Sequence, residues 1–262
     1  MPNGFAQVGQ TLIGTADSVG TTTGTSDVEF GTVVAIADTG RRLAVGARRH
    51  DWNNGTVVNN AGGVFIYDLE NPLGPSSNWV LKTSFVGNAG EQMGRWLAMS
   101  SDGSIIAIRR GNFGAAEVWR VETDGNKAQL GSGLTCNGVA GEGGAQLALS
   151  PDGQRLAMSC EYEGTFNHGT VKIFDWNNST WVQVGTPLTA ALSNSSVGLF
   201  GWDTAFSANG NRIAVSAPNF DAGILEQGLV RVFDFNATAS TWNQVGQDLL
   251  GNITSQKFGE LC

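Results

Sequence analysis

Side chains suited to binding or catalysis gather in four stretches, each of which follows a short apolar segment. Both histidines of the chain lie there, together with arginines and aromatic residues. Aromatic rings beside arginine are the residue types that dominate protein–protein hot spots, so we predict a binding surface in these stretches. Its residues are Arg48, Arg49, His50, Trp52, Arg109, Arg110, Phe113, Tyr162, Phe166, His168, Phe220 and Asp221. The competing interpretation is that the aromatic rings pack beneath their own loops.

Catalytic motifs give little support to an enzyme. The sequence has no Gly-x-Ser-x-Gly nucleophile elbow, and its Ser-x-Asp-Gly strings lack the aromatic residue that would mark a sialidase Asp-box. His50 and His168 lie far apart in the sequence without a pattern of carboxylates around them. We therefore predict no catalytic residue, no metal ion and no cofactor.

The elements that carry these stretches form an internal repeat. A Phe-Gly or related pair opens each copy. The second residue of the pair is a glycine, which recurs at steps of 63, 50, 57 and 58 residues. These glycines are Gly31, Gly94, Gly144, Gly201 and Gly259. A variable period near fifty to sixty residues is typical of one structural unit whose loops differ in length.

Each repeat has the pattern of four short antiparallel strands. An apolar segment is followed by a Ser-x-Asp-Gly string, such as Ser150 to Gly153, which suits a tight turn. A small apolar strand and two alternating strands complete the unit, and no helical periodicity is present. Four-stranded repeats of this length predict an all-β fold, a β-propeller.

The repeats predict one propeller domain over residues 1–262. The expected blades span about 30–87, 93–134, 143–188 and 200–251, with partial blades at 5–14 and 258–262. Four complete blades with parts of a fifth favour a piece of a larger propeller. An imperfect five-bladed ring is the alternative.

The repeat resembles the FG-GAP repeat of integrin α-subunit propellers. Phe30-Gly31, Phe200-Gly201 and Phe258-Gly259 carry the Phe-Gly pair, and Ser216 to Pro218 stands where the Gly-Ala-Pro string would be. The resemblance implies an extracellular, glycosylated adhesion protein. It does not extend to calcium, because the turns between the first two strands hold at most one aspartate each and Ca²⁺ needs several carboxylates.

Charge and cysteine content restrict the partners. The formal net charge is −8 and the sequence pI is about 4.7, which disfavours nucleic acid, and no apolar run is long enough for membrane insertion. Six Asn-x-Ser/Thr triplets suit the secretory pathway or an extracellular location. Cys136 and Cys160 fall in adjacent loops of one repeat, so a disulfide is conceivable, but free or buried thiols are the favoured interpretation.

These observations favour a non-enzymatic propeller that binds a protein or a glycan through one loop face. The first alternative is a hydrolase or lyase with its site at the mouth of the central channel. Its candidate residues are Glu161, Glu163, His168, His50 and Asp221. The second alternative is a structural subunit that binds other subunits or the rest of a longer chain.

Overall fold

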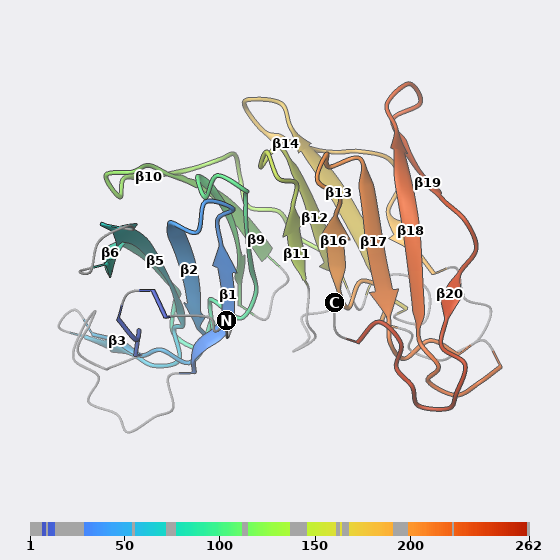
Figure 1. Cartoon of the computed structure of the whole chain (residues 1–262), viewed down its shortest axis with the longest axis horizontal. Helices are drawn as coiled ribbons and strands as arrows, with labels where there is room; N and C mark the ends of the chain where they lie inside the picture. Colours follow the sequence, from blue (N-terminus) through green and yellow to red (C-terminus); the bar gives the residue numbers. More distant parts are fainter. Residues whose placement is uncertain are drawn as a thin grey trace, which may run out of the picture.

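The computed structural model confirms the predicted fold class, an all-β assembly of four antiparallel blades (Figure 1). It describes residues 7–8, 10–13, 29–53, 56–71, 77–111, 115–136, 146–160, 163, 168–190, 199–221 and 223–260. These residues contain strands and turns but no helix, and so no helix suited to crossing a membrane.

Each blade orders its strands from the inside to the outside of the fold. Blade 1 contains β1 (Phe30–Ile36), β2 (Arg42–Ala47), β5 (Gly63–Glu70) and β6 (Asn78–Val86), with β3 (Trp52–Asn53) and β4 (Val57–Val58) as a separate hairpin. Blade 2 contains β7 (Leu97–Met99), β8 (Ile105–Arg110), β9 (Ala115–Val121) and β10 (Lys127–Gln129). Blade 3 contains β11 (Leu147–Leu149), β12 (Arg155–Cys160), β13 (Thr170–Trp176), β14 (Trp181–Gln183) and β15 (Leu188–Thr189). Blade 4 contains β16 (Thr204–Phe206), β17 (Arg212–Ala217), β18 (Leu229–Asn236), β19 (Thr241–Gln244) and β20 (Leu249–Leu250).

The Ser-x-Asp-Gly string forms the turn between the first two strands of a blade. In blade 3 the Ser150 hydroxyl donates to Asp152 Oδ1 and accepts a hydrogen bond from the Arg155 amide at 2.9 Å. Gly153 closes the turn at a φ of +68°, a conformation that glycine adopts without a steric penalty. The same hydroxyl–carboxylate bond forms between Ser100 and Asp102 at 2.7 Å. This local chemistry explains why the turn motif predicts the blade.

The outermost strand of blades 3 and 4 is split in two. In blade 3 both β14 and β15 pair with β13, and Gly185 bends the chain between them at a φ of +75°. Trp181 of β14 is buried and donates its indole N–H to the Leu130 carbonyl of blade 2 at 3.0 Å. The outer tryptophan therefore joins neighbouring blades.

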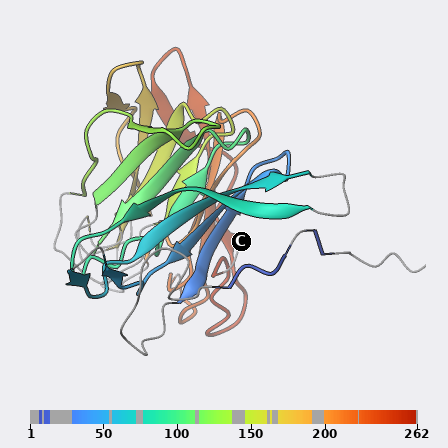
Figure 2. The same ribbon diagram turned by 90° about the vertical axis from the view of Figure 1, so that its left-hand side faces the viewer.

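Successive blades stack side by side, so both faces of an inner blade are covered. Figure 1 shows blade 1 at the left and blade 4 at the right, and Figure 2 shows blade 1 in front of the others. The innermost strands contact one another in the order β1, β7, β11 and β16. Each of the three interfaces between blades has its own buried apolar cluster. The first contains Ile106 and Ile108, the second Met158 and the third Val215, and all four side chains are fully buried. Polar residues at the ends of these strands consequently lie between blades.

Candidate functional site

One position of the repeat sets the chemistry at the loop end of each blade. In three blades, the residue three positions after the second strand makes the same two backbone hydrogen bonds. Its amide donates to the carbonyl of the last residue of that strand, and its carbonyl accepts from the amide of a glycine later in the loop. The His50 and Phe220 amides donate to the Ala47 and Ala217 carbonyls, and the Glu163 amide donates to the Cys160 carbonyl at 3.1 Å. These three residues are equivalent, so blades 1 and 4 place an aromatic ring where blade 3 places a carboxylate.

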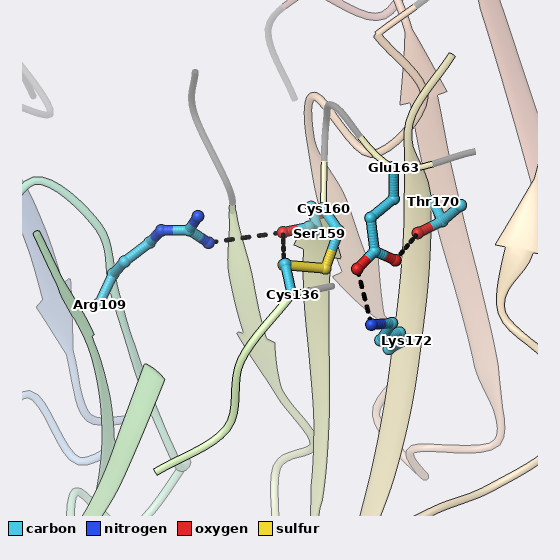
Figure 3. Close-up of a disulfide and its surroundings, with 7 residues drawn as sticks. All are labelled: Arg109, Cys136, Ser159, Cys160, Glu163, Thr170 and Lys172. Atoms are coloured by element: carbon cyan, nitrogen blue, oxygen red, sulfur yellow. Dashed lines mark hydrogen bonds and ion pairs between the residues drawn. A yellow bond between two sulfur atoms is a disulfide. The ribbon is translucent and has the colours of Figure 1, made fainter. Parts of the chain in front are cut away.

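Glu163 belongs to a buried polar group in blade 3 (Figure 3). Its Oε1 lies 2.8 Å from Lys172 Nζ, and its Oε2 accepts a hydrogen bond of 3.1 Å from the Thr170 hydroxyl. The side chains of Lys172 and Glu163 are only 6 % and 10 % exposed. Both oxygens of the carboxylate are therefore held in one orientation at the loop end of β13.

The position of Lys172 also carries a charged residue in two other blades, Arg231 in blade 4 and Glu117 in blade 2, and each of these forms an ion pair. In blade 3, strand pairing sets Lys172 opposite Met158. At the equivalent position of blade 1, Phe65 lies opposite Val45. The Phe65 ring meets His50 edge-on, with 5.3 Å between the ring centroids. Burying an ion pair is costly unless its geometry is good, and the Glu163–Lys172 pair is the most enclosed ion pair among the described residues. Blade 3 is thus the candidate site.

A disulfide lies beside the ion pair. Cys136, which follows the outer strand of blade 2, is bonded to Cys160 at the end of β12 with an S–S distance of 2.01 Å. The free-thiol interpretation of these two cysteines is therefore replaced by a disulfide. Arg109 of β8 donates to the Ser159 carbonyl at 3.4 Å, and Figure 3 places its guanidinium on the opposite side of the disulfide from Glu163. Blades 2 and 3 are joined both covalently and by hydrogen bonding at this end.

The same group has a partial resemblance to a metal site. One ligand atom from each of Cys136, Cys160 and Glu163 lies within 4.8 Å of the others. Zinc binds thiolates, however, and the two sulfurs are bonded to each other. The carboxylate already accepts hydrogen bonds from a lysine and a threonine. In this oxidised form the group does not fit a metal ion.

A second ion-pair group occupies the interface between blades 1 and 2. Arg110 donates from Nε and Nη2 to both oxygens of Glu91 at 2.7 and 2.9 Å, and from Nη1 to Glu117 at 3.1 Å. Burial alone would raise the pKa of Glu91, but the hydrogen bonds from Arg110 and from the Asn88 amide outweigh it and lower that pKa. The pair with Glu91 also raises the pKa of Arg110. Both groups are thereby held in their charged forms.

The predicted surface residues have structural contacts within the described chain. Arg48 and Arg49 both pair with Glu29, at 2.7 and 3.1 Å. The side chains of His50, Arg109, His168 and Phe220 are buried, and Trp52 is half-buried. Asp221 accepts a hydrogen bond from the Glu226 amide. Glu161, Phe113, Tyr162 and Phe166 lie outside the described residues.

The described members of the predicted hydrolase set come from three blades, and His168 lies with Glu163 in blade 3, where the Gly169 amide donates to the Glu163 carbonyl. His50 and Asp221 belong to blades 1 and 4, whereas Glu163 lies in blade 3 and is paired with Lys172. Lys172 and Thr170 were absent from the predicted set, because they lie within an alternating strand and not in a loop. The available signal was a charged residue that recurs at this strand position in blades 2, 3 and 4.

No family model matches the sequence, and no curated protein matches it. Solved structures match the fold. A candidate 6-phosphogluconolactonase from Bacteroides fragilis has a TM-score of 0.56 and 17% identity, over 84% of this chain and 55% of that chain. A candidate 6-phosphogluconolactonase from Bacteroides uniformis has a TM-score of 0.55 and 17% identity, over the same shares. A protein of unknown function from Desulfotomaculum acetoxidans has a TM-score of 0.52 and 16% identity, over 81% of this chain and 54% of that chain. The chain spans about half the length of these structures, and at this identity the likeness establishes the fold alone.

These comparisons correct three expectations. The resemblance to FG-GAP repeats is wrong, because the neighbours carry the 6-phosphogluconolactonase name. The expectation of a non-enzymatic binding protein is wrong for the same reason, since a lactonase is a hydrolase. An adhesion role and a glycoprotein character lose their support with the FG-GAP assignment. The Phe-Gly pair and the Asp-Gly turn stabilise blade geometry, which propellers of different function share.

Proposed function

We propose that this chain forms part of a propeller hydrolase that opens cyclic esters. The observation that carries the proposal is the buried Glu163–Lys172 pair, held by Thr170 at the loop end of blade 3. The names of the fold neighbours support a lactone as the substrate class.

The chemistry assigns Glu163 the part of general base. A water molecule held by the carboxylate adds to the lactone carbonyl carbon while its proton passes to Glu163. Collapse of the tetrahedral intermediate breaks the bond to the ring oxygen, which takes the proton and leaves a hydroxy acid. Lys172 and Thr170 keep the carboxylate oriented, because each binds a different oxygen, and an oriented base is the condition for efficient proton transfer.

The test is a lactone-opening assay with a panel of γ- and δ-lactones, with and without a phosphate group. Acid release is measured against the spontaneous rate. We expect turnover on at least one class, and we expect Glu163→Gln to lower kcat by roughly a hundredfold or more. Absence of turnover across the panel would overturn the proposal.

Asp248→Asn is the matched control. Asp248 pairs with Arg231 at 2.7 Å in blade 4 and, like Glu163, is a largely enclosed carboxylate with a cationic partner. Its substitution tests whether loss of any ion pair at a blade interface lowers the rate. Equal losses in the two variants would assign the effect to folding and not to catalysis.

The disulfide bears on where this function is carried out. Disulfides persist in oxidising compartments and are rare in the cytosol, so the Cys136–Cys160 bond supports a secretory or extracellular location for the chain. Growth of the native source with detection of the protein in the medium tests this part of the proposal.

A further inference from the structure

The outer side of blade 4 carries an arginine whose hydrogen bonding is incomplete. Arg212 donates from Nε and Nη2 to the two oxygens of Asp234 at 2.6 and 2.7 Å. Its side chain is 55 % exposed, and that of Asp234 is 41 % exposed. No hydrogen bond is formed by Nη1 among the described residues.

Two other blades contain the same pair in a completed form. Arg42 binds Asp68 in blade 1, and its Nη1 reaches the Gly103 carbonyl in the turn of blade 2 at 3.2 Å. Arg155 repeats this contact in blade 3.

In blade 3, Arg155 binds Asp175, and its Nη1 reaches the Gly210 carbonyl in the turn of blade 4 at 2.9 Å. The guanidinium also lies over the Phe235 ring of blade 4, 4.2 Å from its centroid. In both completed pairs the arginine therefore binds the glycine turn of the next blade.

The clefts beside Arg155 and Arg212 differ in volume. The cleft at Arg155, between Asp175 and the turn at Gly210, has a volume of about 170 Å³. The equivalent cleft at Arg212 and Asp234 has a volume of about 350 Å³. The cleft beside Arg212 therefore has the larger volume. In blade 3, the turn of the following blade lines the equivalent cleft.

The chain already begins the next contact at this face. A Cβ placed on Gly201, at the start of blade 4, would lie 3.0 Å from Ser159 Cβ and 2.9 Å from Val171 Cγ2 of blade 3. One step along the repeat, a Cβ on Gly259 would lie 2.8 Å from Ser216 Cβ and 2.8 Å from Val230 Cγ2 of blade 4. Gly259 therefore packs on blade 4 as Gly201 packs on blade 3.

We propose that this face of blade 4 is a docking site for one further blade of the same repeat, which starts at Phe258–Gly259 and presents its turn glycine carbonyl to Arg212 Nη1. Its aromatic outer strand residues cover the guanidinium, as Phe235 covers Arg155.

A second copy of the chain fits this face less well. Its first blade would bring Phe30 and Gly31 to the place that Phe258 and Gly259 already occupy. On the side of that blade which would face Arg212, Val45 and Phe65 are buried within one chain, whereas Val34 and Ile36 of the inner strand are exposed. We therefore assign the docking site to a blade that continues from Phe258–Gly259.

The test extends the chain by one blade. Residues 260–262 are replaced by a second copy of residues 202–251, so that Phe258–Gly259 stands in place of Phe200–Gly201. We expect the extended chain to melt at a higher temperature than the parent, with the added residues protected from hydrogen exchange. Arg212→Leu should lower the Tm of the extended chain by roughly 3–8 °C and that of the parent by no more than about 1 °C.

Arg155→Leu is the control, because its acceptor at Gly210 is present in both chains and its effect should be equal in both. An added blade without exchange protection, or an equal Arg212→Leu shift in parent and extended chain, would overturn the proposal. So would a parent that is dimeric in solution and becomes monomeric with Arg212→Glu, because a second copy would then occupy the face.

Discussion

His50 is a buried histidine whose replacement by phenylalanine should stabilise the protein. Its side chain is 4 % exposed, and its Nε2 atom is buried with no hydrogen-bond partner among the described residues. The equivalent residue of blade 4, Phe220, has the same backbone bonds and is 5 % exposed. The repeat therefore accepts an aromatic hydrocarbon at this position.

The expected gain follows from the unsatisfied nitrogen. Burying a polar group without a partner costs about 1–3 kcal/mol, and His50→Phe removes that cost while it retains the edge-on contact with Phe65. Phenylalanine is larger than histidine, so some of the gain is lost to tighter packing. We expect a net increase of about 1–2 kcal/mol in the free energy of unfolding at pH 7.5, which raises the Tm by roughly 2–8 °C.

The gain should grow in mild acid. Burial lowers the pKa of His50 below its ordinary value of 6.5, although the Asp51 carboxylate partly opposes the shift. Below about pH 6.5 the unfolded chain therefore takes up a proton that folded His50 resists, and the wild type loses stability. His50→Phe removes this loss, because phenylalanine does not titrate.

The assay is urea unfolding of the wild type and His50→Phe at pH 7.5 and pH 5. Other titrating groups are common to both proteins and cancel in the difference. A variant that is no more stable than the wild type at pH 7.5, or whose advantage is the same at pH 5, would refute the reasoning about the buried nitrogen.

Three further changes test the blade interfaces. Replacing Cys136 and Cys160 by serine opens a loop with a sequence separation of 24 residues and should lower the free energy of unfolding by about 3 kcal/mol; a urea midpoint like that of the wild type would contradict this. Arg42→Leu should cost about 3 kcal/mol in the same assay, because it leaves the Asp68 carboxylate half-enclosed without its partner, and an effect as small as that of the exposed Arg41→Leu would count against it. Glu91 has a pKa held below its ordinary 4.5, so the stability from its ion pair is present above about pH 4.5 and is lost as the pH falls through the folded-state value. Glu91→Gln should therefore flatten the decline in Tm below pH 4.5, and an unchanged decline would show that other carboxylates cause it.

Much of the blade architecture can be predicted from the sequence because its signals are local. The hydroxyl–carboxylate bond at Ser150 and Asp152 and the positive φ of Gly153 depend on four consecutive residues. The small apolar residues in the second strand of each blade likewise indicate that this strand is buried on both faces. The placement of Trp181 between blades also follows from its recurrence at the start of the outer strand.

The candidate site could not be read in the same way. Lys172 occupies an alternating strand, where every second side chain would face water in a two-layer sheet. In this fold the neighbouring blade covers that face, so Lys172 is buried and needs a carboxylate. Its partner Glu163 comes from a loop, and only the return of the backbone after Cys160 brings the two together. The protein family was misassigned because the motifs behind it build blades and do not specify chemistry.

The position of the disulfide also determines how the repeat comes apart. Repeat arrays unfold by separation of neighbouring units, with each interface adding its own stability. Cys136 and Cys160 fasten blade 2 to blade 3, so a break at that interface releases little chain entropy. Among the four described blades, the interfaces without a disulfide should open before the fastened one, which is also where Glu163 and Lys172 lie. Blades 2 and 3 would thus keep their mutual geometry while the interfaces on either side of them open and close.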